Sequence, residues 1–229
     1  MDPCSLVLET LFVFTNGRIA TTREPSARRA PAFVIVRDAT SCAWAVGAHV
    51  ARQLAETLDA LAGEEQPSAD PQQPPRHEAR YRELVGDAVM FGPGFLFPDP
   101  IAAPAQLIEV IADEQPLVHH FRGWVPGEIA GGCAPVMAIV VDGKPVSVCF
   151  SARSSEVAAA AGVETAAPFR GRGYAVAVTA AWARAIRASG RIPMYGTAWT
   201  NHSSIAVARK LGLIAHASSW SSGWTQGLG

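Results

Sequence analysis

The stretch that decides the fold is Gly162-Val-Glu-Thr-Ala-Ala-Pro-Phe-Arg-Gly-Arg-Gly-Tyr-Ala-Val176, in which a short apolar run leads into a glycine-rich turn. Apolar residues at spacings of three and four follow this turn, as expected for an amphipathic helix. Gly171 and Gly173 can adopt backbone angles closed to other residues, so successive N–H groups can converge on an anion at the start of the helix. Arg170 and Arg172 add positive charge there. The stretch predicts a strand, a phosphate-binding turn and a helix.

Two common nucleotide motifs fit this turn poorly. A P-loop requires Lys followed by Ser or Thr after its last glycine, and Tyr174-Ala175 stand there instead. A dinucleotide fingerprint requires a third glycine, which is absent from Gly171-Arg-Gly-Tyr-Ala-Val176. A nucleotide-binding protein of another fold stays open as an alternative, and it predicts stabilisation by ATP or NAD.

A second informative segment follows about thirty residues later. Residues 193–199 are typical of a strand, and residues 201–212 are typical of a helix with a defined start and stop. Thr200 or Asn201 can cap this helix, and Gly212 suits the left-handed position after it.

Together the two segments resemble the GNAT superfamily, the GCN5-related N-acetyltransferases. Arg170-x-x-Gly173-x-Ala175 resembles the pyrophosphate signature Q/R-x-x-G-x-G/A. Asn201, Ser204, Lys210 and Gly212 match the family's N-x-x-A/S-x-x-x-Y-x-K-x-G-F segment. Leu213 and Ala208 depart from it, because the family usually has an aromatic residue at the first position and Tyr at the second. The resemblance extends over residues 91–220 and implies an α/β fold with a splayed mixed sheet and helices on both faces.

The resemblance further implies that acetyl-CoA is the cofactor. Its pyrophosphate would lie on Arg170, Gly171, Arg172, Gly173, Tyr174 and Ala175, and its pantetheine arm along Val163, Glu164 and Thr165. Asn201 and Ser204 would lie near the arm or the adenine end, although Asn201 can equally be a helix cap and nothing more.

An acyltransferase of this kind needs a base for the incoming amine and a proton for the departing thiolate. Glu164 and Glu156 are the candidate bases nearest in sequence. Because Ala208 stands where the family usually has the tyrosine that donates the proton, His202, Ser203, Ser204 and Tyr195 are the candidate replacements. The predicted function is N-acetyl transfer to a primary amine of a small molecule or a protein. The alternative, favoured by Ala208, is a non-catalytic acyl-CoA sensor.

Composition excludes several classes of protein. The net charge of −1 with 17% charged residues argues against nucleic acid as the main partner, because phosphate neutralisation needs clustered Lys and Arg. The four cysteines are scattered and the adjacent His119-His120 pair does not point at one ion, so no metal site is expected.

No apolar run is long enough to span a membrane, and we expect a cytoplasmic protein. Sheet edges at the C-terminus could pair in a homodimer.

Three parts of the chain differ in pattern. Residues 1–63 predict a small α+β unit with a hairpin turning at Asn16-Gly17, a strand and a helix. The proline-rich region 64–85 predicts a linker, without regular structure and mobile over residues 64–77. Residues 86–229 predict the GNAT-like domain, which begins with a strand at 91–97, a helix at 104–112, a helix at 117–124 and a glycine-rich loop at 126–135 that borders the substrate opening.

Overall fold

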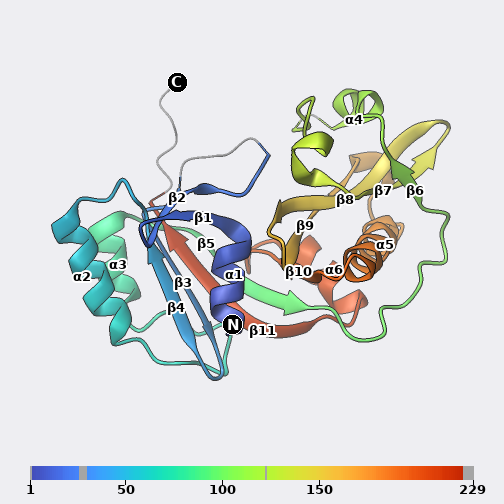
Figure 1. Cartoon of the computed structure of the whole chain (residues 1–229). Helices are drawn as coiled ribbons and strands as arrows, with labels where there is room; N and C mark the ends of the chain where they lie inside the picture. Colours follow the sequence, from blue (N-terminus) through green and yellow to red (C-terminus); the bar gives the residue numbers. More distant parts are fainter. Residues whose placement is uncertain (1, 26–29, 122, 224–229) are drawn as a thin grey trace.

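The computed structural model describes residues 2–25, 30–121 and 123–223. Nine of the described strands form one mixed sheet in the order β4-β3-β11-β5-β10-β9-β8-β7-β6, and β1 and β2 form a separate hairpin (Figure 1). Among the pairings within this described sheet, β9 and β10 run parallel and the other neighbours run antiparallel. The expected α/β class with a mixed sheet is therefore confirmed.

The first half of the chain contains more structure than its pattern predicted. Its elements are α1 (Pro3–Leu11), β1 (Phe12–Thr15), β2 (Arg18–Thr22), β3 (Phe33–Asp38), β4 (Cys42–Val46), α2 (Arg52–Gly63) and α3 (Glu78–Val85). The hairpin at Asn16-Gly17 is confirmed, with φ of 51° and 74° at the two turn residues. Helix α1 was missed although Asp2 caps it by accepting from the N–H of Ser5 at 3.1 Å.

The second half of the chain contains the strands and helices expected above, except for one helix. Its elements are β5 (Ala88–Leu96), β6 (Glu109–Ile111), α4 (Gln115–His120), the π-type turn η1 (Ile129–Cys133), β7 (Val136–Val141), β8 (Lys144–Ser154), β9 (Ala158–Thr165), the short η2 (Ala167–Phe169), α5 (Tyr174–Ala188), β10 (Ile192–Gly196), α6 (His202–Lys210) and β11 (Ile214–Ser222). The helix expected at 104–112 is wrong, because β6 pairs there with β7, with Glu109 opposite Ala138.

The proline-rich segment is tied to the sheet by a buried ion pair. As expected, residues 64–77 form no helix or strand, but α3 occupies the rest of the predicted linker region. Glu65 lies 3.8 Å from the guanidinium of Arg37 on β3, with both side chains almost fully buried. The Glu65 carboxylate also accepts from the N–H groups of Arg76 and His77 at 2.9 and 3.0 Å. These contacts hold the segment against the sheet instead of leaving it free.

The division into 1–63, 64–85 and 86–229 stays a prediction. Strand β3 from the first part pairs with β11 from the last, from Phe33 opposite Ser222 to Asp38 opposite Ala217. The sheet therefore runs across the predicted boundary.

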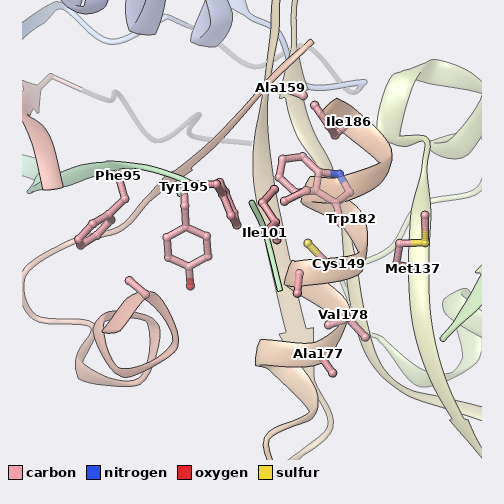
Figure 2. Packing of buried hydrophobic residues seen from close by; sticks show 14 of the residues in the cluster. Phe95, Ile101, Met137, Cys149, Ala159, Ala177, Val178, Trp182, Ile186 and Tyr195 are labelled. Carbon is pink, nitrogen blue, oxygen red and sulfur yellow. The ribbon is translucent and has the colours of Figure 1, made fainter. Parts of the chain in front are cut away.

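The two faces of the sheet carry different helices. Alternate residues of β3 face opposite sides: Val34 and Val36 pack in the cluster that contains α1, whereas Phe33 and Ile35 pack in the cluster that contains α2 and Tyr81 of α3. A third cluster packs α5 and α6 against the same face as α2 and α3, and it includes Trp182, Cys149 and Tyr195 (Figure 2). Helix α4 covers the opposite face with the fourth cluster.

None of the helices in the described ranges combines the length and the apolar composition that a membrane crossing requires.

Candidate cofactor-binding cavity

A cavity opens where the two parallel strands separate. β9 and β10 pair from Ala158 opposite Ile192 to Ala160 opposite Met194. Beyond this point β10 continues along β5, and β9 continues along β8 as far as Thr165. The cavity between them has a volume of about 440 Å³. It is lined by Val163, Glu164, Thr165, Phe169, Arg170, Gly171, Gly173, Tyr174, Ala175, Val176, Tyr195, Asn201, Ser203, Ser204, Ala206, Val207 and Lys210.

The wall formed by β9 presents main-chain hydrogen-bonding groups to the cavity. Ala166 donates its N–H to the Val146 carbonyl of β8 at 2.9 Å. Because inward and outward groups alternate along an antiparallel ladder, the N–H and C=O of Val163 point away from β8. No bulge interrupts the register between these residues. Val163 therefore offers an open strand edge to an extended ligand on the side that β10 has left.

The floor of the cavity is the turn that begins α5. Gly171 and Gly173 have φ of 77° and 81°, which only glycine adopts without strain. Gly173 is the N-cap of α5 and has no side chain to accept from the first helical N–H groups. The turn therefore directs donors and the positive end of the helix dipole toward the cavity.

The two arginines of the turn are held by nearby backbone carbonyls. Arg170 donates from Nε to the Thr165 carbonyl at 3.1 Å. Arg172 donates to the Pro168 carbonyl at 3.4 Å and lies over the Phe169 ring, with 5.2 Å between the guanidinium carbon and the ring centroid. Arg170 lines the cavity, whereas Arg172 is not among the residues that do.

Helix α6 closes the opposite side of the cavity. Asn201 caps it, and the Asn201 Oδ1 accepts from the Ser204 N–H at 3.1 Å and from the Ser203 hydroxyl at 2.8 Å. Asn201, Ser203, Ser204 and Lys210 all line the cavity. His202 is exposed and is not among the lining residues.

The structure separates the two glutamates proposed as bases. Glu164 lines the cavity, whereas Glu156 is exposed in the turn before β9. Eight residues of extended chain place Glu156 on the order of 20 Å from the cavity. Glu164 pairs with Val148, which packs under α4, so its side chain lies on the α4 face of the sheet. Partial burial raises the pKa of the Glu164 carboxyl, and the positive charge of Arg170 opposes this shift.

Tyr195, expected from sequence only as one of several replacements for the missing tyrosine, is a titratable group of the cavity. It follows Met194, the last β10 residue paired with β9, and its residue surface is 4% exposed. Its hydroxyl donates to the Ser204 carbonyl of α6 at 3.4 Å. Figure 2 shows the ring beside Phe95 with the hydroxyl at its far end. Burial raises the pKa of the Tyr195 hydroxyl, an effect that the hydrogen bond with Ser204 partly offsets.

Ala208 lies in the same cluster and is 1% exposed. Ser204 and Ala208 are four residues apart on α6, so they occupy one face of that helix. The Tyr195 hydroxyl thus reaches the helix face on which the family's tyrosine would stand.

In the part of the chain that the structure describes, no group of three or more His, Cys, Asp or Glu side chains is arranged to hold a metal ion.

Comparisons with solved structures gave low sequence identities. A GNAT-family protein from Novosphingobium aromaticivorans is 18% identical, with a TM-score of 0.48, and the match covers 59% of this chain and 65% of that one. A GCN5-related N-acetyltransferase-like protein from Streptococcus suis is 17% identical, with a TM-score of 0.47 and 84% of each chain covered. A tandem GNAT protein from the clavulanic acid biosynthesis pathway is 14% identical, with a TM-score of 0.49, 91% of this chain and 80% of that chain covered.

The chain thus spans just under two thirds of the first of these structures. A search of curated proteins found no match. Residues 132–218 match the family model described as GNAT acetyltransferase, and this range contains β9, the glycine turn, α5, β10 and α6. The segment that builds the cavity is therefore similar to the GNAT acetyltransferase family.

Proposed function

We propose that this protein is an acyl-CoA-dependent N-acyltransferase that transfers acetyl from acetyl-CoA to a primary amine by direct attack. The observation that carries the proposal is the combination of one open strand edge at Val163 and one glycine turn at the start of α5 in a single cavity. An extended arm ending in a diphosphate is complementary to this pair of features, because the edge can pair with amides and the turn with phosphate oxygens.

The residues present fit coenzyme A without a metal. The amides after Gly171 and the start of α5 would hold the phosphates, with Arg170 beside them. Val163 would hold the pantetheine amides through its main chain. Acetyl-CoA, when bound, supplies an activated acyl group whose transfer releases a thiolate that must be protonated.

The cavity offers Glu164 as the base and Tyr195 as the proton donor, with Ser203 and Ser204 as alternative donors. Glu164, on the α4 face, would accept a proton from the incoming ammonium, directly or through water. Tyr195, which lines the cavity from the α6 side, would donate the proton to the thiolate. Glu156 and His202 do not line the cavity and have no part in this proposal. The acceptor is an amine of a small molecule or a peptide.

Ala208 favours a second candidate, a non-catalytic acyl-CoA sensor, because α6 itself provides no proton donor at that position. Both candidates predict that coenzyme A stabilises the fold, by about 2.7 kcal/mol at a concentration one hundred times its Kd. Release of free thiol from acetyl-CoA with a panel of amines would support the enzyme. Binding without release from any amine would support the sensor. Stabilisation by ATP or NAD but not by coenzyme A would reject both.

A further inference from the structure

The outer edge of β4 is an open strand edge far from the cofactor cavity. β4 ends the nine-stranded sheet and pairs with β3 on one side. Next to the turn that joins β3 and β4, Asp38 donates its N–H to the Ser41 carbonyl at 3.0 Å. At the open end of this hairpin, Gly47 donates its N–H to the Ala32 carbonyl at 2.8 Å. Alternation along the ladder then makes Ile35 and Trp44 a non-hydrogen-bonded pair. The main-chain N–H and C=O of Trp44 therefore point outward.

The hairpin β1-β2 covers only the end of this edge. Ala48, just past β4, donates its N–H to the Ile19 carbonyl at 2.8 Å, and Gly47 forms a parallel bridge with Ile19. No other strand of the described sheet continues this pairing toward Cys42. An open edge of this kind is a template for another extended chain.

A groove of about 360 Å³ lies beside the open edge. Its walls come from α1, β1 and β4, and it is lined by Ser5, Leu8, Glu9, Phe14, Ala43 and Trp44. Leu8 and Phe14 give it an apolar interior that suits an aliphatic side chain. The indole of Trp44 is already fixed, because its Nε1 donates to Asp59 of α2 at 3.1 Å.

One carboxylate, that of Glu9, borders the groove. Glu9 is exposed, and among the described residues its carboxylate is in no ion pair. The nearby Arg23 donates its Nε to the main-chain carbonyls of Glu9 and Phe12 at 2.8 and 3.0 Å. The carboxylate is therefore complementary to a basic side chain of a bound partner.

We propose that this edge binds an extended peptide of a partner protein by strand addition. The added strand pairs with the main chain of Trp44, which supplies affinity without sequence preference. Side chains of a strand alternate between faces, so residues two positions apart both face α1, roughly 7 Å from each other. The recognised pattern is an aliphatic residue for the groove and Lys or Arg two positions away for Glu9.

The test uses the full-length protein and a fluorescent seven-residue threonine peptide that carries one leucine and, two positions later, one lysine. We expect binding by fluorescence anisotropy and slower amide hydrogen exchange at residues 42–46. Glu9→Lys should weaken binding about tenfold, and a peptide N-methylated at the amides that face β4 should not bind. The control is Glu109→Lys, which reverses the charge of an exposed glutamate on β6, at the other end of the sheet.

Three results would overturn the proposal. The first is absence of binding at millimolar peptide, and the second is equal binding of the N-methylated peptide, which would mean that no strand is added. The third is protection of residues 42–46 by dimerisation of the protein itself, seen by light scattering, which would assign the edge to a second copy. No coenzyme A enters the experiment, so its outcome is independent of the acyltransferase proposal.

Discussion

At the scale of single residues, Tyr195 is the side chain on which turnover depends most in the proposed mechanism. It is buried at the point where β9 and β10 separate, and burial keeps its hydroxyl protonated by raising its pKa. Tyr195→Phe should lower kcat about 100-fold, the usual scale for loss of a general acid, and leave the Kd for coenzyme A within about twofold. Stopped-time thiol release and a coenzyme A titration measure the two quantities.

Tyr174→Phe is the matched control for that variant, because Tyr174 also lines the cavity but begins α5. It should retain turnover. If Tyr195→Phe retained it as well, the proton would have to come from another group, and Tyr195 would be a packing residue only.

Glu164 gives the proposed mechanism a defined pH dependence. A base must be ionised, so kcat/KM should fall as the pH drops through the Glu164 pKa, which partial burial places above its usual value. The charge of Arg170 lowers that pKa. Arg170→Gln should therefore raise it further and move the acid limb to higher pH, whereas Glu164→Gln should remove the limb. The profile of kcat/KM against pH measures both shifts.

The pH at which the acid limb of kcat/KM lies is the quantity to compare, because Arg170→Gln also weakens cofactor binding in this proposal. Arg172→Gln provides the comparison, since Arg172 is not among the groups that shift the Glu164 pKa. An acid limb that survives in Glu164→Gln would assign the base to another residue.

At the scale of elements, the sequence was informative where one residue type meets one geometric requirement. Asn16-Gly17 predicted a tight turn, and Gly171 and Gly173 predicted left-handed backbone before a helix. All four residues have positive φ. Helix α1 had a comparable signal in Asp2 and Pro3, which was overlooked. The helix expected at 104–112 failed because β6 is defined by its partner β7, and strand pairing of three residues leaves almost no local pattern.

The candidate site follows the same rule. The glycine turn and the α6 cap are local features and could be read from sequence. The position of Tyr195 in the cavity could not be predicted, because it depends on the separation of β9 and β10 after Met194. That separation is a property of β5, β9 and β10 together.

Gly173 and Gly190 allow the binding role of the α5 turn to be separated from its backbone strain. Both have φ of 81°, they flank the two ends of α5, and an added Cβ would meet no atom within 4 Å at either. Alanine at either position should cost about 1–2 kcal/mol of unfolding free energy, measured in urea. Only Gly173→Ala should weaken coenzyme A binding, by about tenfold. Equal affinity in the two variants would remove the turn from the proposed binding site.

At the scale of the whole molecule, the sheet links the predicted N-terminal unit to the family segment. β11 is the last strand that the structure describes, yet β3 pairs with its second part, from Asp38 opposite Ala217 to Phe33 opposite Ser222. Trp220 of β11 is 1% exposed because Phe33 and Tyr81 pack on it, with ring centroids 6.3 and 5.6 Å away. The buried Arg37–Glu65 pair adds a second link between the sheet and the segment that follows α2.

A fragment of residues 86–229 should therefore not fold by itself, although it contains the entire match to the family model. Deleting residues 1–85 uncovers Trp220 and leaves one side of β11 without a partner, which favours aggregation. We expect no cooperative urea transition and no coenzyme A binding from the fragment alone, and recovery of both when residues 1–85 are co-expressed as a second chain. A fragment that unfolds cooperatively and binds coenzyme A as tightly as the full chain would instead support the predicted boundary at 64–85. In that case the contacts between β3 and β11 would join two independently stable units. The N-terminal unit would then bind a peptide at the edge of β4 without affecting the cavity.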